Sequence, residues 1–388
     1  MSARVPHLTA KLQGFGTTIF AEMSALAVAT GSVNLGQGFP DRDGPESMRA
    51  AAAKVLMEGP NQYPPMRGMP QLRQAIAAHA LRLHGLTYDA ESEVLVTTGA
   101  TEALTDTLFA FLSPGDEIVL IEPAFDVYRP LAAGAVVKSL TLSPPHWRLT
   151  PEALKAAITP RTRVVLLNNP NNPVGRVFTP EELNDLADAV RASNAVVIAD
   201  EVYEHLTFDD RKHICFSSLP GMRERTVRIG SAGKIFSLTG WRVGWVMGPK
   251  ALMDVVTNVH QFVTFATPPA QQLGVAHGLT HEMEFPLRLC RELQDNRDFL
   301  AEGLSRLGFD VLPAQGTYFL TAGIGKLGAD KDRAFCERMV VEGGVAAIPL
   351  SPFFSGGTPD IYVRFAFCKQ RAVLEEALAR LKAYFNQG

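Results

Sequence analysis

Short apolar runs alternate with longer helical patterns along the first 280 residues of the chain. Several runs, such as VVLL and AVVIAD, are apolar on both faces, which is typical of strands in a parallel sheet covered on both sides. The pattern predicts strands over 94–98, 117–121, 135–140, 163–168, 195–200, 227–231 and 244–247. Helix starts lie between them: Thr150 and Thr179 each precede a proline, and Glu182 completes a capping box with Thr179. This alternation predicts a doubly wound α/β sheet.

The pattern changes after about residue 280. The elements expected there are a long amphipathic helix, three short strands and a final helix, over 284–307, 309–312, 316–321, 361–367 and 372–385. Such a mixture is typical of a smaller α+β domain. We therefore expect a large domain over 46–280 and a small domain formed by 1–45 together with 281–388.

Composition supports this organisation and excludes some functions. A chain of 388 residues is long for one domain, since about 150 residues per domain is usual. It holds 37 Lys and Arg against 40 Asp and Glu, a net charge of −3 that does not favour a general nucleic-acid or membrane-surface binder. The 46% hydrophobic and 20% charged residues fit a folded globular protein rather than a disordered one.

Cysteine use and hydropathy predict a cytoplasmic protein. The four cysteines form no C-x-x-C pair and are expected to be free thiols: Cys215, Cys290, Cys336 and Cys368. The N-terminal residues lack the apolar core of a secretory signal. Residues 255–281 contain no Asp, Glu, Lys or Arg, but polar residues such as Asn258 and Gln261 argue against a membrane span.

The string SAGK, which ends at Lys234, allows three functional interpretations. It matches the S-x-x-K of serine β-lactamases, but the S-D-N and K-T-G strings of that family are absent. A phosphate-binding loop of the G-x-x-x-x-G-K-[ST] type would need wider glycine spacing and a hydroxyl where Ile235 stands. The third interpretation is a Schiff-base lysine with Ser231 and Arg242 binding a phosphate nearby. A solvated surface lysine is the plain alternative.

The position of Lys234 favours a site. It follows one predicted strand, and Asp200 ends another, where open α/β sheets bind ligands. A carboxylate there could cap a helix, or it could pair with the protonated ring nitrogen of a pyridine cofactor. Tyr203 could be a core residue or could bind the phenolic oxygen of such a cofactor.

Two further strings have both a functional and a structural interpretation. Gly99, Ala100 and Thr101 follow a strand and open a helix, whose free N–H groups could bind phosphate. They could equally form an ordinary strand–helix turn. In NNPNNPVG, two Asn-Pro steps predict a rigid loop that could present the Asn172 amide inward.

Taken together, these strings resemble the fold-type I pyridoxal-phosphate aminotransferases of class I/II, and among them the kynurenine/glutamine and methionine aminotransferase group. The resemblance runs through nearly the whole chain, in VNLGQGFPD, NQYPPMRGMPQLRQAI, TTGATEAL, NNPNNPVG, ADEVYEHL, SAGKIFSLTGWRVGW, GTYFL, GVAAIPLSPF and VRFAFCK. It implies a large domain with a mostly parallel seven-stranded sheet, a smaller α+β domain, and a homodimer with shared active sites. It also implies pyridoxal 5′-phosphate as cofactor and no metal, nucleic-acid or membrane partner.

The resemblance assigns roles at the matching positions. Lys234 would bind the cofactor covalently and move the proton on the substrate Cα, and Asp200 would pair with the pyridine nitrogen. Tyr203 and Asn172 would bind the 3′-oxygen. The cofactor phosphate would lie against Gly99, Ala100, Thr101, Ser231 and Arg242, and Tyr63 would reach it from the neighbouring subunit. Phe125 would stack on the ring, while Gly36, Asn172 and Arg364 would bind the substrate.

The activity implied is amino transfer between a neutral L-amino acid (methionine, glutamine, or an aromatic or kynurenine-like one) and a 2-oxo acid. Near Ile19 the chain lacks a tryptophan that some kynurenine enzymes carry, which argues against kynurenine as the preferred donor. Aspartate-specific relatives carry a second arginine in the stretch that corresponds to 255–281, where this chain offers Phe262 and Phe265 beside His260.

Other functions stay open at this point. A cysteine-S-conjugate or cystathionine β-lyase would use the same residues, and an N-succinyldiaminopimelate aminotransferase would look similar over its whole length. An effector-sensing regulator would carry a helix-turn-helix domain first, whereas the family pattern here begins by about residue 14.

Overall fold

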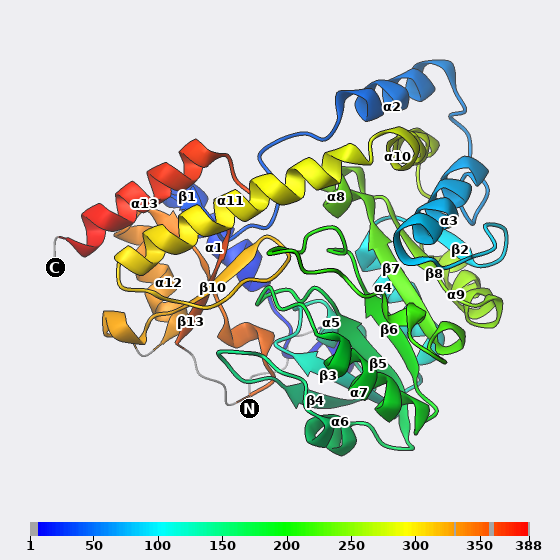
Figure 1. Ribbon diagram of the computed structural model, residues 1–388, viewed down its shortest axis with the longest axis horizontal. Coiled ribbons are helices and arrows are strands. Elements are labelled where there is room, and N and C mark those ends of the chain that lie inside the picture. The colour runs from blue at the N-terminus through cyan, green and yellow to red at the C-terminus, as the bar shows by residue number, and fades with distance from the viewer. Residues whose placement is uncertain (1–6, 330, 357–360, 387–388) are drawn as a thin grey trace.

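The computed structural model describes residues 7–329, 331–356 and 361–386. A seven-stranded sheet with helices on both faces forms the larger part, and a four-stranded sheet with three helices forms the smaller part (Figure 1). The long helix α11 (Glu284–Arg306), yellow in Figure 1, runs between the two. This is the α/β class with a second α+β part that the sequence predicted.

The central sheet has the strand order β2-β8-β7-β6-β5-β3-β4. Its strands are β2 (Val94–Thr97), β3 (Glu117–Glu122), β4 (Val136–Thr141), β5 (Thr162–Asn168), β6 (Val196–Asp200), β7 (Thr226–Ser231) and β8 (Gly244–Met247). β8 runs opposite to the other six strands and pairs antiparallel with both β2 and β7. All seven predicted strands are therefore confirmed. Six are buried along nearly their whole length, which leaves a clear apolar signal, whereas the edge strand β4 is mostly exposed or half-buried. The register sets Asn168 beside Asp200, and Ser231 ends the adjacent strand β7, so three polar residues meet at one edge.

Helices of the large part cover both faces of this sheet. They are α2 (Glu46–Glu58), α3 (Pro70–His84), α4 (Ala100–Phe111), α5 (Tyr128–Leu131), α6 (Pro151–Ala157), α7 (Pro180–Arg191), α8 (Ala232–Ile235), α9 (Lys250–Val263) and α10 (Pro269–His281). The predicted capping box opens α7: Thr179 Oγ accepts from the Glu182 amide at 3.3 Å and the Glu182 carboxylate accepts from the Thr179 amide at 2.8 Å. Leu183, Leu186 and Val190 are buried at helical spacing and fix the face that packs on the sheet.

The smaller part is built on the sheet β12-β13-β10-β9. Its elements are β9 (Asp310–Val311), β10 (Phe319–Gly323), α12 (Asp332–Val341), β11 (Val345–Ala346), β12 (Ile348–Pro349), β13 (Tyr362–Ala366) and α13 (Arg371–Phe385). The predicted strand 316–321 begins three residues late, because Thr317 has a φ of 67° and turns the chain before the ladder starts.

The N-terminal region packs on this smaller part. Helix α1 (Ile19–Thr30) contacts α12, and β1 (Val33–Asn34) pairs in parallel with β11. Residues after β1 then cross toward the central sheet, so a short N-terminal segment lies between the two sheets.

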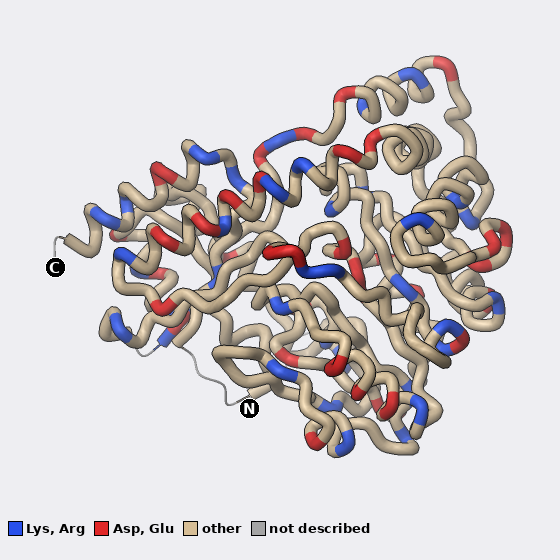
Figure 2. Tube along the Cα trace, in the orientation of Figure 1, with Lys and Arg blue, Asp and Glu red and all other residues tan. Residues whose placement is uncertain are grey.

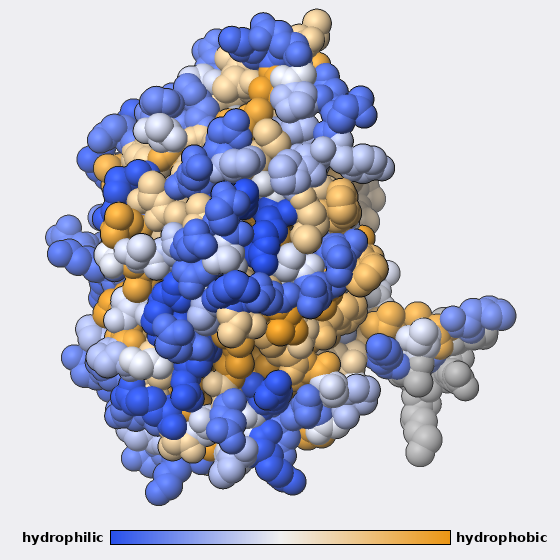
Figure 3. Space-filling model, turned by 90° about the vertical axis from the view of Figure 1, so that its right-hand side faces the viewer, coloured by the Kyte–Doolittle hydropathy of each residue, from blue (hydrophilic) through white to orange (hydrophobic). Residues whose placement is uncertain are grey.

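Charged residues of both signs are spread along the chain, as Figure 2 shows. Among the described residues, no helix is both long and apolar enough to cross a bilayer. Figure 3 shows apolar side chains gathered among polar ones on one face of the large part.

Candidate active site

A cavity of about 320 Å³ lies at the carboxyl ends of the central strands, closed on the other side by β10 and β13. Ten residues singled out from the sequence line it: Ala100, Thr101, Phe125, Asn172, Asp200, Tyr203, Ser231, Lys234, Arg242 and Arg364. Its lining also includes residues that the sequence did not point to, among them Phe20, Gln37, Tyr128, Asn168 and Phe319.

Lys234 lies in α8, directly after β7, and its amine is enclosed. The Nζ donates a hydrogen bond to Tyr318 Oη at 2.7 Å, and Tyr318 Oη in turn donates to the Gly38 carbonyl at 2.7 Å. Burial lowers the pKa of Lys234 to about 8. About one molecule in ten would then carry a neutral amine at pH 7, compared with about one in 2,500 at the usual pKa near 10.4. This amine can act as a nucleophile or a base near neutral pH.

Asp200 lies at the end of β6 and is buried. Tyr128 Oη donates to its Oδ2 at 2.6 Å, and the Val202 amide donates to its Oδ1 at 3.4 Å. Burial raises the pKa of Asp200 to about 6, and the hydrogen bond from Tyr128 opposes that rise. Asp200 is therefore mostly ionised at pH 7 and can hold a buried positive charge.

An anion-binding corner lies at the start of α4. Gly99 occupies the N-cap position with a φ of 80° and no side-chain cap, which leaves the first amides of the helix free for a ligand. A Cβ on Gly99 would lie 2.6 Å from Arg242 Nη2, so glycine is what allows this guanidinium to approach the helix start. Ser231 lines the same corner, and Gly99 itself lines a small adjoining cavity with Lys234 and Arg242.

Arg364 on β13 is a buried cation held by neutral groups. Its Nη1 donates to Asn172 Oδ1 and its Nη2 to the Gly36 carbonyl, both at 2.8 Å, and its guanidinium carbon lies 3.8 Å from the centre of the Phe319 ring. Burial lowers the pKa of Arg364 to about 10, so the group remains charged at neutral pH. A buried charge that lacks a hydrogen-bonded anion favours an anionic ligand, and the planar fork suits a carboxylate.

Three predicted residues lie outside the lining of this cavity: Gly99, which lines the small adjoining one, Gly36 and Tyr63. The Gly36 carbonyl accepts a hydrogen bond from Arg364, which does line the cavity. Tyr63 is 88% exposed, and its ring meets Phe265 edge-on with the centroids 5.8 Å apart. Its contact with a second subunit stays a prediction.

His260, which the sequence placed near the substrate side chain, has a different setting. It is fully buried, and its Nδ1 lies 3.2 Å from Glu102 and 3.1 Å from Asp106, both on α4. Burial opposes protonation, but the bonds to Asp106 and Glu102 outweigh it and raise the pKa of His260 to about 9. His260 thus fixes α9 to α4, whereas Phe262 is 85% exposed and so is not a core residue.

We expect His260→Gln to destabilise the protein more at pH 6 than at pH 9.5. A folded-state pKa of about 9 exceeds the unfolded value of about 6.5, so the stabilisation is complete below pH 6.5 and is lost as the pH rises through 9. The shift corresponds to about 3 kcal/mol at most. Urea unfolding gives the free energy of unfolding of both proteins at the two pH values. The change in their difference between the two pH values isolates His260, because the titrations of the other groups cancel. A destabilisation that does not change with pH would contradict the charged His260.

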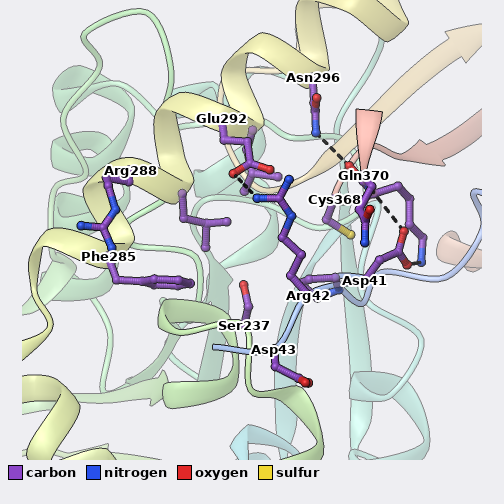
Figure 4. A pocket seen from close by; sticks show the side chains of 14 residues that line it. Asp41, Arg42, Asp43, Ser237, Phe285, Arg288, Glu292, Asn296, Cys368 and Gln370 are labelled. Carbon is purple, nitrogen blue, oxygen red and sulfur yellow. Dashed lines mark hydrogen bonds and ion pairs between the residues drawn. The ribbon is translucent and has the colours of Figure 1, made fainter. Parts of the chain in front are cut away.

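A second cavity, of about 260 Å³, lies between α11 and residues 40–43 (Figure 4). Arg42 bonds to Glu292 at 3.1 Å, and Lys369 bonds to Asp41 at 2.9 Å and to the Phe39 carbonyl at 3.0 Å. These bonds anchor the segment that continues from Gly38 at the first cavity. The residues around the second cavity therefore help to hold the segment that leads to the first cavity. Most of the charged side chains there are paired with one another.

Comparison with known proteins agrees with this geometry. Residues 30–381 match the sequence model of the family "Aminotransferase class I and II". The chain is 44% identical to the probable N-succinyldiaminopimelate aminotransferase of Mycobacterium tuberculosis, over 96% of this chain and 97% of that protein. It is 40% identical to the methionine aminotransferase of Escherichia coli, with the same two coverages.

Two solved structures superpose closely. That of the N-succinyldiaminopimelate aminotransferase from Mycobacterium tuberculosis has a TM-score of 0.95 at 44% identity, covering 97% of this chain and all of that one. YbdL from Escherichia coli, described as having a methionine aminotransferase function, has a TM-score of 0.94 at 39% identity, covering 97% and 99%. The chain therefore belongs to the class I and II aminotransferases and is an enzyme with the fold-type I architecture of that pyridoxal-phosphate-dependent family.

Proposed function

We propose that this enzyme uses pyridoxal 5′-phosphate to move an amino group between a neutral L-amino acid and a 2-oxo acid. The observation that carries the proposal is the buried amine of Lys234, with its lowered pKa, in one cavity with Asp200 and Arg364. The residues present fit the cofactor. The uncapped start of α4 with Arg242 and Ser231 fits a phosphate, and Asp200 fits a protonated pyridine nitrogen.

The chain's own groups then have distinct tasks. When bound, the cofactor supplies an electron sink for the negative charge that develops at the substrate Cα. Arg364 binds the α-carboxylate of the substrate, and Asn172, already bonded to Arg364 through Oδ1, has its amide nitrogen available for a ligand. Lys234 would take the Cα proton on Nζ and deliver it to the cofactor side instead of back to Cα, and Tyr318 orients that amine. Tyr203 lines the cavity and can donate its hydroxyl proton to the 3′-oxygen.

The side chain preferred is neutral and fairly large. The cations that line the cavity within the described residues are Lys234, Arg242 and Arg364, and each already has a task. The second carboxylate of aspartate would lack a fixed partner, which costs several kcal/mol when buried. A methionine or phenyl side chain instead gains roughly 1.5–3 kcal/mol by burial, against aromatic residues such as Phe20, Phe125 and Phe319.

We expect kcat/KM for L-aspartate to be at least about tenfold below the best of L-methionine, L-glutamine and L-phenylalanine, a difference of about 1.4 kcal/mol. The measurement uses one saturating 2-oxo acid acceptor for all four donors. Equal or faster turnover of aspartate would overturn the neutral pocket.

A screen of the half-reaction tests the proposed function directly. Purified enzyme is mixed with each amino acid in turn, and the loss of cofactor absorbance is followed without an acceptor. N-succinyl-L,L-diaminopimelate belongs in this screen as the second candidate, because a relative at 44% identity bears that activity in its name. Release of pyruvate and ammonia from cystathionine or a cysteine S-conjugate would reveal the β-lyase alternative. If no amino acid changes the absorbance, the proposal fails.

We further propose a cytoplasmic homodimer in which Tyr63 completes the phosphate site of the partner subunit. Its exposure, together with that of Phe262 and Phe265, supports this arrangement, since apolar surface of this kind is common at interfaces. The division into a large domain over 46–280 and a small domain of 1–45 with 281–388 is part of the same proposal, supported by the pairing of β1 with β11.

A further inference from the structure

A cluster of ionisable side chains is buried away from the cavity, between α3 and the loop that follows β6. Glu201 and Glu204 on this loop both contact Arg228 of β7, and His84 Nε2 lies 2.7 Å from Glu204 Oε2. The proposed mechanism uses none of these groups. Two carboxylates face one guanidinium, so the cluster carries an excess negative charge wherever its imidazoles are neutral.

Two histidines in this cluster point ring nitrogens at each other. His79 Nε2 on α3 lies 2.9 Å from His205 Nε2 on the loop. One ligand atom from each of His79, Glu204 and His205 lies within 4.8 Å of the other two. His79 and Glu204 are almost completely buried, whereas His205 is partly exposed, which leaves an approach from solvent.

Two buried polar atoms of the same residues lack a partner among the described residues. Glu204 Oε1 accepts no hydrogen bond, although Oε2 is bonded to His84 and Arg228, and His79 Nδ1 is also unbonded. An ionised carboxylate oxygen that is buried without a partner costs free energy, which a cation would recover.

We propose that His79, Glu204 and His205 form a binding site for a divalent transition-metal cation of the zinc type. Two imidazole nitrogens and one carboxylate oxygen are a donor set that zinc accepts in a tetrahedral arrangement, with water as the fourth ligand.

The distances and protonation states suit this occupant. Zinc–nitrogen distances of about 2.0–2.1 Å place two ligand nitrogens about 3.3 Å apart in a tetrahedron, so the observed pair must open by roughly 0.4 Å. Burial lowers the pKa of His79 to about 3 and also lowers that of His205, so both rings are neutral and offer lone pairs. The proton now shared between the two Nε2 atoms would move to Nδ1 of the ring that carries it, and no proton needs to leave.

The site would connect α3 to the loop that also carries Tyr203. Because His79 Nδ1 lacks a hydrogen-bond acceptor, the support that usually strengthens a metal-ligating histidine is incomplete. We therefore expect micromolar rather than nanomolar affinity.

The test is calorimetric titration of chelator-treated holoenzyme with zinc sulfate. His277 and His281 lie one turn apart on α10 with ring centroids 4.8 Å apart, and could bind zinc at the surface, so the titration uses the His277→Gln/His281→Gln background. One zinc per chain is expected. His79→Gln and His205→Gln should each weaken binding at least about tenfold, while His146→Gln, an exposed histidine elsewhere, should not.

A second measurement guards against variants that do not fold. Cobalt(II) added to the same background protein should give the visible bands of a tetrahedral complex, and X-ray absorption of the bound metal should show two imidazoles and no sulfur. Saturating zinc should raise the unfolding temperature by roughly 3 °C. Absence of binding below 1 mM, binding unchanged in both folded variants, or thiolate coordination would each overturn the proposal.

Discussion

Lys234→Ala is expected to reduce transamination by at least about 10⁴-fold and to let the cofactor leave on gel filtration. Lys234 contributes the only lysine side chain to the cavity lining within the described residues, and burial has already lowered its pKa to about 8. The substitution removes both the covalent attachment and the group that moves the Cα proton. The measurement is the turnover rate with the best donor of the screen, together with the cofactor content of the purified variant.

Chemical rescue separates loss of the amine from loss of the fold. Small amines such as methylamine, added with excess cofactor, should restore part of the activity of Lys234→Ala, because the space of the missing side chain can admit them. A misfolded protein would gain nothing from them. Turnover near the wild-type rate without added amine would end the assignment of Lys234.

The elements of the large part could be predicted from the sequence because their signals are local. Strands β5, β6 and β7 are largely apolar runs that are buried on both faces. The start of α7 is indicated by the four consecutive residues of its capping box. Strands β11 and β12 contain only two residues each, which is too short to leave a pattern.

Two residues that contact the site could not be predicted from the sequence, for a different reason. Tyr128 and Tyr318 contact Asp200 and Lys234 across separations of 72 and 84 residues, and each resembles a core aromatic in the sequence. Their roles arise from tertiary packing, which no local string records.

The ion-paired setting of His260 could have been predicted from the charges on α4. Glu102 and Asp106 lie four residues apart in α4, and both fall on its buried face. Two acids on a buried helix face require a cationic partner. The stretch 255–281 has no Lys or Arg and offers His260 as the first of its three histidines, so the spacing of the acids was a usable signal for a histidine partner.

Asp200→Asn is expected to retain the cofactor and the fold but to slow proton removal from the substrate by about 10³-fold or more. The amide has the shape of the carboxylate, and its oxygen can still accept from the Val202 amide while its NH2 group donates to Tyr128 Oη in place of the present bond. It carries no charge, however, so a protonated ring nitrogen would lose its partner and the electron sink would weaken. Each unit by which the ring pKa falls corresponds to about 1.4 kcal/mol. Exchange of the Cα proton of the best donor for deuterium measures this step without the rest of the cycle.

Tyr128→Phe is the matched control, because it leaves the carboxylate in place and removes one bond to it. That bond opposes the effect of burial, so its loss should raise the pKa of Asp200 above its present value of about 6. In the free enzyme the acid limb of the pH profile should then move to higher pH, with a loss of rate near pH 7 of only about tenfold. Deuterium exchange that is as fast in Asp200→Asn as in the wild type would refute the role of the charge. Slow exchange in Asp200→Asn and a shifted acid limb in Tyr128→Phe would together show that the required negative charge lies on the Asp200 carboxylate.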